Sequence, residues 1–383
     1  MNFQFYAPTQ IIAGRGESAR AGEFAASLGK KAFVVMSRSL WENGAAKLVL
    51  NSLAAKNISR VEYIKPPGEP TVEMADDAAR QAAGARCDLV ISMGGGAVID
   101  LAKAAAGLAS NGGSIQDYLE GVGQGLQVSK PALPHIAMPS TAGAGAEMTR
   151  NAVIRSQQGR FKKSFRSSYL YPTLAILDAE LSLSLPPQQT AYSGMDAITQ
   201  LIESYISRRA TPVTDALALC GLERALFSIR EVYQDGSAIE HRENMLLASS
   251  LSGVCLANAG LGMAHGFASG LGALYDAPHG KVCAMLLPHA LKFNRCAQLD
   301  KLARIGRLLT HDASLSNEDC ADLLIQYIKD LNKEFGIPTN LREFNIPKDE
   351  QPLLIKMSMG NSMSGNPIPI TENVAKTILE ALT

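Results

Sequence analysis

A buried strand that ends in three consecutive glycines constrains the first half of this chain. Residues 87–93, CDLVISM, form an apolar run, the glycines at 94–96 end it, and residues 97–110 continue with a helical pattern. Such an apolar run is typical of a strand that is buried on both faces, as in parallel sheets covered by helices. We therefore expect a strand, a tight glycine loop and a helix in immediate succession.

The same alternation extends over the first half of the chain. Further strands are expected at residues 9–16, 31–36, 60–64 and 135–138, with helical segments between them. This order favours a mainly parallel sheet with helices on its faces. From Pro186 onward only helical patterns are found, at residues 190–207, 212–231, 241–258 and 320–335. We predict an α/β domain at residues 1–182 and an all-α domain at residues 183–383.

Composition excludes several classes of protein. The 383 residues suffice for two cores, and 36 basic residues balance 36 acidic ones. Proteins that bind nucleic acids or membrane surfaces usually carry a basic excess, so we expect neither partner. The N-terminus has no signal-peptide pattern, and no run approaches the ~18 apolar residues of a membrane span. The six cysteines form no CxxC pair, which favours a reduced, cytoplasmic protein.

Two loops of small residues predict a phosphate-binding edge of the sheet. The glycine loop precedes a helix, whose N-terminus offers N–H groups and partial positive charge to a phosphate. Alone, this loop is equally compatible with a plain turn, because it is neither a G-x-G-x-x-G nor a P-loop motif. The stretch 139–149, PSTAGAGAEMT, also follows a strand. Two such loops at the carboxyl ends of neighbouring strands favour a bound dinucleotide.

The residues after the strand at 31–36 bear on the choice of cofactor. An acidic residue there would accept hydrogen bonds from the adenine ribose and repel a 2′-phosphate. This chain has Ser37 and Arg38 instead, a small polar residue and a cation, which favours NADP(H) over NAD(H). The alternative is that Arg38 is only a solvated surface charge.

The second half contains a candidate metal site. Asp196 and Gln200 are four residues apart in a helical pattern and therefore face the same way. His265 and His279 lie in a glycine-rich stretch, 261–289. A buried carboxylate requires a cation or hydrogen-bond donors. Taken one at a time, Asp196 is also compatible with a helix N-cap, His265 with a core histidine and His279 with a turn residue.

Together these motifs resemble the iron-containing (group III) alcohol dehydrogenases of the dehydroquinate-synthase-like superfamily. The motifs occur in family order over nearly the whole chain: GGGAVIDLAK, PSTAGAGAEMT, GMDAITQLIESYIS, AGLGMAHGFAS, DAPHG and LLPHALKFN. The resemblance implies an N-terminal dinucleotide-binding domain, an all-helical C-terminal domain and a homodimer. It also implies hydride transfer between nicotinamide C4 and a metal-bound small alcohol or aldehyde, usually with Fe2+ and sometimes with Zn2+.

The resemblance assigns residues to each role. The metal aspartate falls on Asp196 and two metal histidines on His265 and His279. A third histidine is expected where this chain has Gln200, and a further one, near the nicotinamide, where it has Ser269. The expected cofactor contacts are Ser37, Arg38, Gly94, Gly95, Gly96, Asp100, Lys103, Ser140, Thr141, Thr149 and Lys162.

The glutamine at position 200 leaves two alternatives, a site that binds a metal and a site that has lost it. An amide oxygen is a weaker and harder ligand than imidazole, so Gln200 either adds a weak fourth ligand or holds a metal-bound water. The alternative is a site that has lost its metal, with Gln200 bonded to the substrate. Because position 269 holds a serine instead of the expected histidine, proton exchange relies on Ser269, the ribose hydroxyls or solvent.

Two other functions remain compatible with the sequence. One is a related oxo-acid reductase, similar to maleylacetate reductase, with Arg208 and Arg209 as candidate anion contacts. The other is a cofactor-binding protein without turnover, since two histidines of the family pattern are absent.

Overall fold

The computed structural model describes residues 2–383, which divide into two compact units. The sheet unit consists of Ala7–Leu185 and Gly236–Ser250. The helical unit consists of Pro186–Asp235 and Leu251–Thr383, together with the N-terminal residues up to Tyr6. This division differs from a single cut near residue 182, because α9 (Ile239–Ala259) contributes residues to both units.

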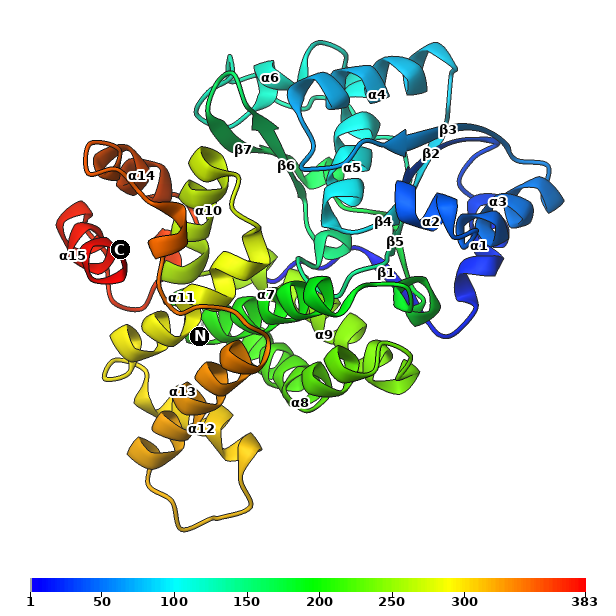
Figure 1. Ribbon diagram of the computed structural model, residues 1–383. Coiled ribbons are helices and arrows are strands. Elements are labelled where there is room, and N and C mark those ends of the chain that lie inside the picture. The colour runs from blue at the N-terminus through cyan, green and yellow to red at the C-terminus, as the bar shows by residue number, and fades with distance from the viewer. Residues whose placement is uncertain (1) are drawn as a thin grey trace. The chain divides into compact units, whose positions relative to one another are not determined.

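Six parallel strands form the centre of the sheet unit (Figure 1). In spatial order they are β1 (Gln10–Ala13), β8 (Leu174–Leu177), β5 (His135–Pro139), β4 (Leu89–Gly94), β2 (Lys31–Ser37) and β3 (Ser59–Lys65). Every neighbouring pair is parallel. The predicted α/β domain with a mainly parallel sheet is therefore confirmed, and the glycine loop follows one of its inner strands.

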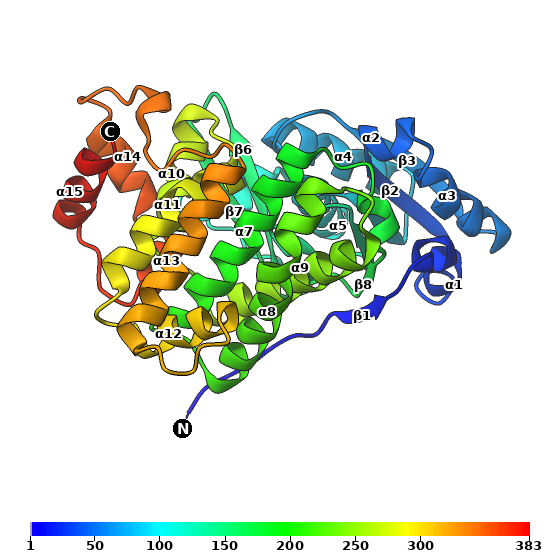
Figure 2. The same ribbon diagram turned by 60° about the horizontal axis from the view of Figure 1, so that its bottom comes forward.

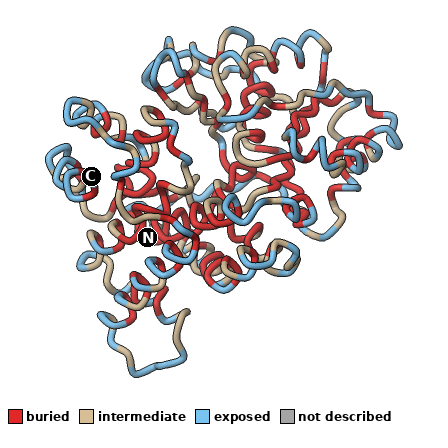
Figure 3. The backbone as a smooth tube through the Cα atoms, viewed as in Figure 1, coloured by how far each residue is buried: buried red, intermediate tan, exposed pale blue. Residues whose placement is uncertain are grey.

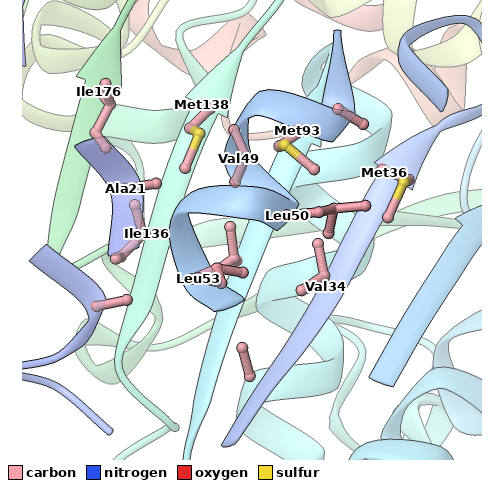
Figure 4. Packing of buried hydrophobic residues seen from close by; sticks show 14 of the residues in the cluster. Ala21, Val34, Met36, Val49, Leu50, Leu53, Met93, Ile136, Met138 and Ile176 are labelled. Carbon is pink, nitrogen blue, oxygen red and sulfur yellow. The ribbon is translucent and has the colours of Figure 1, made fainter. Parts of the chain in front are cut away.

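Alternate residues of the strands face opposite layers of helices. On β4, Leu89, Ile91 and Met93 join a buried cluster with side chains of α1 (Ala21–Ala25) and α3 (Ala46–Ala55). Figure 4 shows Val49 and Leu53 of α3 against these strands. Ile99 of α5 (Gly96–Asn111) packs with Ala137 of β5, and α4 (Val72–Gly84) packs beside α5. The sheet is thus covered on both faces, as its continuous apolar runs require.

The sheet unit also contains structure that the sequence patterns did not predict. β8 is one such strand, and an antiparallel hairpin of β6 (Asn151–Ser156) and β7 (Phe161–Arg166) is another addition. Short helices α2 (Arg38–Glu42) and α6 (Ile115–Tyr118) complete the unit.

Helices make up the helical unit, as predicted for the second half of the chain. They are α7 (Pro187–Ile206), α8 (Pro212–Gln234), the end of α9, α10 (Met263–Tyr275), α11 (His279–Asn294), α12 (Leu299–Gly306), α13 (Asn317–Glu334), α14 (Gln351–Ser358) and α15 (Glu372–Leu382). Within residues 2–383 every strand precedes Pro186. α7 packs against both α8 and α11, and α11 against α13 (Figures 1 and 2).

Most of α7 is buried. Every residue from Gly194 to Ile206 is buried; Figure 3 colours buried residues red along the chain. A helix that is buried all round normally carries apolar residues. Polar side chains in this stretch, such as Asp196, Gln200 and Glu203, therefore require partners inside the unit.

No single helix of residues 2–383 has both the length and the apolar character needed to cross a membrane. α9 and α10 meet these criteria only as a pair, and they are bent by 97° at the break between them.

Candidate metal centre and cofactor loops

Three polar residues of α7 share one face of the helix. Asp196, Gln200 and Glu203 occupy positions i, i+4 and i+7, which point the same way from an α-helix. Their exposed fractions are 5%, 2% and 2%. Buried carboxylates are costly unless they bind a cation or accept hydrogen bonds, so this face defines a polar site within an apolar unit.

α10 and α11 bring the other side chains of the site. His265 lies in the first turn of α10, and α11 begins at His279 directly after Pro278. Cys283 is one turn further along α11 and is fully buried. Donor atoms of Asp196, His265, His279 and Cys283 all lie within 4.8 Å of one another. The structure thus brings together the three predicted ligands and a cysteine that the sequence patterns did not single out.

Glu203 orients His265. Its Oε2 lies 2.7 Å from His265 Nδ1, and its carboxylate also accepts from the backbone N–H groups of Gly262 (3.0 Å) and Ala264 (2.7 Å). These bonds cap the N-terminus of α10 and hold the imidazole ring. Since a carboxylate accepts, Nδ1 carries a proton, and in the neutral imidazole Nε2 then presents its lone pair. A carboxylate behind a histidine is the usual partner of a metal-bound imidazole.

Two buried atoms at the centre of the site fit a cation. Among residues 2–383, Asp196 Oδ1 and His265 Nε2 have no hydrogen-bond partner. They lie 3.3 Å apart, so an anionic oxygen faces the lone pair of a nitrogen. Such an arrangement is repulsive unless a metal ion or a proton lies between the two atoms. The residues present therefore fit a bound metal.

The ionisation of the metal-free site also favours positive charge at its centre. Burial disfavours the imidazolium, but the neighbours of the ring, including the carboxylates of Asp196 and Glu203, outweigh it and raise the pKa of His265 well above its ordinary value. Burial likewise opposes ionisation of Asp196, yet His279 and His265 outweigh it and lower the pKa of this carboxyl. Burial raises the pKa of the Cys283 thiol to about 12, so this thiol is neutral without a metal.

The other predicted residues of this region lie on the same helices. The Gln200 side chain donates through Nε2 to Ser252 Oγ at 3.2 Å. Ser269 is half-buried on α10, one turn after His265. His289 donates to the carbonyl oxygen of Thr339, consistent with the structural role that its position after Pro288 suggests.

The two small-residue loops lie against each other at the carboxyl edge of the sheet. β4 and β5 are neighbours, and a Cβ placed on Gly95 would lie 3.2 Å from Oγ1 of Thr141. The N–H of Ser140 donates to the carbonyl of Gly94 at 3.0 Å. Gly95 stands at the N-cap of α5 without a side-chain capping bond. Backbone and small side chains thus form a surface that a phosphate can approach closely.

Lys103 holds the end of the second loop in place through hydrogen bonds. Lys103 is 1% exposed, and its ammonium donates to Thr149 Oγ1 at 2.9 Å and to the carbonyl of Asn151 at 2.8 Å. It also lies 3.3 Å from Asp100 Oδ1, and Asp100 Oδ2 accepts from the N–H of Val153. An ammonium has three protons, and these three partners use them all. The geometry therefore accounts for Asp100, Lys103 and Thr149 as residues that position the loop.

The remaining predicted cofactor residues lie nearer the surface. Lys162 on β7 forms an ion pair with Glu69 at 2.9 Å. Ser37 caps α2 by accepting from the N–H of Leu40. Arg38 is largely exposed and lies 3.6 Å from Glu42, so its guanidinium retains donors for a phosphate.

Both halves of the chain match known protein families. Residues 8–179 match the model for iron-containing alcohol dehydrogenase, and residues 190–383 match that for the C-terminal part of the Fe-containing alcohol dehydrogenase family. The NAD-dependent methanol dehydrogenase of Bacillus methanolicus is 32% identical over 382 residues, 99% of each chain. The 1,3-propanediol dehydrogenase of Citrobacter freundii is 33% identical over 369 residues, 94% of each chain. A crystal structure of a 1,3-propanediol oxidoreductase has a TM-score of 0.93 at 30% identity and covers 100% of both chains.

The fold, the buried cluster of metal-type donors and the glycine loop together define a metal- and nucleotide-dependent oxidoreductase. The chain belongs to the iron-containing alcohol dehydrogenase family. This assignment confirms the predicted two-part fold and the predicted nicotinamide-dependent alcohol oxidoreductase activity.

Proposed function

We propose that this protein is an NAD(P)-dependent alcohol dehydrogenase and aldehyde reductase with Asp196, His265 and His279 as metal ligands. The observation that carries the assignment is the buried pair of Asp196 Oδ1 and His265 Nε2, which are 3.3 Å apart. Fe2+ is the metal of the family name, and Zn2+ suits the same carboxylate and imidazole donors.

Each residue then has a defined task. Glu203 binds Nδ1 of His265 and so directs Nε2 of this histidine at Asp196. Gln200 lies on the same face of α7 and contributes a weak ligand or holds water. When bound, the metal would act as a Lewis acid that polarises the oxygen of the substrate. The Ser269 hydroxyl, one turn beyond His265, offers a proton-exchange group close to solvent.

The sheet unit supplies the nicotinamide cofactor site. The loop of Gly94, Gly95 and Gly96 at the start of α5, with Ser140 and Thr141 beside it, offers backbone N–H groups and small hydroxyls to the pyrophosphate. The cofactor carries the hydride. Ser37 and the exposed Arg38 favour NADP(H), and Lys162 contributes positive charge on the hairpin.

The substrate class we propose is small alcohols and aldehydes. The relatives named above act on methanol and 1,3-propanediol, which supports this class. The oxo-acid alternative has less support, because the Arg209 guanidinium donates to the side chain and carbonyl of Asn361. We further propose a cytoplasmic homodimer without nucleic-acid or membrane partners.

One experiment tests the proposal. Protein purified without chelators is analysed for metal, and reduction of an aldehyde panel is measured with NADPH and with NADH. We expect bound metal, aldehyde turnover and a higher kcat/KM with NADPH, which Arg38→Ala reduces selectively. His265→Ala should lose nearly all turnover. Nucleotide binding without turnover of any carbonyl would instead identify a non-catalytic protein, and full activity after metal removal would contradict the metal assignment.

A further inference from the structure

Cys283 belongs to the donor cluster by position and by distance. It lies four residues after His279 on α11, so both side chains point from the same face of this helix. Its Sγ is 3.8 Å from His279 Nε2, and it is 0% exposed. The buried thiol thus lies directly beside a proposed ligand.

The separations of the four donor atoms match one metal ion. Bonds of about 2.0–2.3 Å from a tetrahedral Zn2+ to N, O and S would place neighbouring ligand atoms about 3.3–3.6 Å apart. Here His265 Nε2 and His279 Nε2 lie 3.3 Å and 3.8 Å from Asp196 Oδ1. The 3.8 Å between Cys283 Sγ and His279 Nε2 is close to the same value. All four donors lie within 4.8 Å of one another, so side-chain movements without a change of fold can bring them to tetrahedral distances.

Gln200 is the weaker candidate for a fourth ligand. Its amide nitrogen donates to Ser252, and its amide oxygen is a harder donor than a thiolate. The neutral donors Gln200, His265 and His279 would leave the metal with a single anionic ligand, whereas a thiolate adds a second. The thiolate therefore compensates better for a 2+ ion in this buried site.

We propose that Cys283 coordinates the metal as a thiolate, together with Asp196, His265 and His279, and that this ligand set selects Zn2+ over Fe2+. The inference rests on the proposed function, because it concerns the same site. Thiolate ligands favour Zn2+, whereas oxygen ligands suit harder cations. With four protein ligands, a substrate oxygen requires expansion to five ligands, which zinc sites accommodate.

Cobalt(II) provides a readout that is independent of activity. Metal-free protein is titrated with Co2+, and the absorption spectrum is recorded. A thiolate ligand produces a charge-transfer band in the near ultraviolet, which nitrogen and oxygen ligands do not produce. We expect this band in the native protein and in Cys255→Ala, a control in which another fully buried cysteine of the helical unit is removed.

In Cys283→Ala the band should disappear while the visible d–d bands of Co2+ remain. Loss of a direct ligand should weaken binding by at least the ~10–100-fold typical of an outer-shell partner. In a competition with equal Zn2+ and Fe2+, the native protein should retain Zn2+, and Cys283→Ala should lose part of this preference. These results would support the proposal.

The possible outcomes distinguish failure of thiolate ligation by Cys283 from failure of the proposed metal site as a whole. Co2+ bound to native protein with d–d bands but no charge-transfer band would overturn thiolate ligation and leave the proposed metal enzyme intact. A band that persists in Cys283→Ala would also overturn it. No Co2+ binding to native protein at all would overturn both. Because the native spectrum alone decides the first case, the test does not depend on whether the variant folds.

Discussion

A single carboxylate, Glu203, joins the geometry of the metal site to the stability of a helix. It accepts from Nδ1 of His265 and from backbone N–H groups at the start of α10. A charge-assisted bond to a ligand histidine fixes the tautomer and the ring orientation. The same bonds satisfy N–H groups that have no partner within the helix. Glu203 is thus a positioning residue for the metal and a cap for α10.

Glu203→Gln should therefore weaken metal binding without removing a ligand. The amide has nearly the same shape, but it lacks the charge and one acceptor, so His265 loses its fixed tautomer. We expect a ~10–100-fold loss of metal affinity and a loss of roughly 1–3 kcal/mol of stability from the poorly satisfied N–H groups. Competition with a chromophoric chelator measures the first and urea denaturation the second. Glu223→Gln, on the exposed side of α8, is the matched control, and equal metal affinity in both variants would refute this role.

The residues of the site differ in how far the sequence reveals them. Asp196, His265 and His279 are found from the motifs because each is an unusual residue for its apolar surroundings. Glu203 continues the spacing of Asp196 and Gln200 along one helix face, but a glutamate in a helical pattern is more typical of an exposed surface. Cys283 was missed because a lone cysteine in an apolar run is typical of a core residue. Its role depends on the approach of three helices, which no local pattern encodes.

At the scale of elements, the site depends on how closely α11 approaches α7. Gly280 lies directly after the ligand His279, and a Cβ at this position would lie 2.2 Å from the carbonyl oxygen of Tyr192 and 3.2 Å from Cβ of Asp196. No real Cβ tolerates the first distance, so one of the helices must shift if glycine is replaced. The glycine is therefore required for contact between the two ligand-bearing helices.

Gly280→Ala should damage both the packing and the metal site. Overpacking of a core typically costs about 1–3 kcal/mol, and the clash here involves backbone rather than a flexible side chain. We expect a lower melting temperature and a substoichiometric metal content. Gly84→Ala at the end of α4 is the control, because a Cβ there meets no atom within 4 Å and alanine is the better helix former. A melting temperature and metal content in Gly280→Ala that match those of Gly84→Ala would contradict the prediction.

The elements themselves were predictable where their patterns are long. The inner strands β2 and β4 and the long helices α7, α8 and α9 stand out as apolar or periodic runs. β8 escaped detection because its four residues, LAIL, are too short to separate from a helical pattern. In β6 only alternate residues are buried, so the hairpin lacks the continuous apolar run of the inner strands.

For the molecule as a whole, a buried histidine makes stability depend on pH. His135 in β5 is 3% exposed and bonded to Ser92 Oγ at 2.8 Å. Burial, with a smaller contribution from Lys103, lowers the pKa of His135 to about 3. The unfolded chain takes up this proton near its ordinary pKa of about 6.5, so the folded state is fully favoured above that pH and loses stability as the pH falls toward 3.

Between pH 6.5 and 3 this group alone should lower the free energy of unfolding by about 1.4 kcal/mol per pH unit. His135→Gln places an amide near the position of Nε2 and removes the titration, so its unfolding free energy should fall less steeply with acid than that of the native protein. Urea denaturation at several pH values measures both slopes. The exposed His311→Gln is the control. Parallel acid slopes in the native protein and in His135→Gln would show that His135 is not kept neutral by the fold.

The division into two units predicts that the metal and the nucleotide stabilise different parts of the chain. All four donors of the metal centre lie in the helical unit, and both cofactor loops lie in the sheet unit. A ligand stabilises only the unit that must fold to bind it, by about 2.7 kcal/mol at a concentration 100 times its Kd, or roughly 5–10 °C. Metal should therefore raise the melting transition of the helical unit, and NADP(H) that of the sheet unit.

The only tryptophan, Trp41, follows β2 in the sheet unit, so its fluorescence reports unfolding of that unit, while calorimetry records both. Addition of Zn2+ to metal-free protein should shift a calorimetric transition and leave the Trp41 transition in place, and Asp196→Ala should abolish the shift. NADPH should move the Trp41 transition in both proteins, because the loops beside β4 and β5 do not depend on the metal. A single transition that moves equally with either ligand would mean that the two units unfold as one cooperative body. In that case the metal centre would stabilise the cofactor loops as well, and its removal would weaken nucleotide binding.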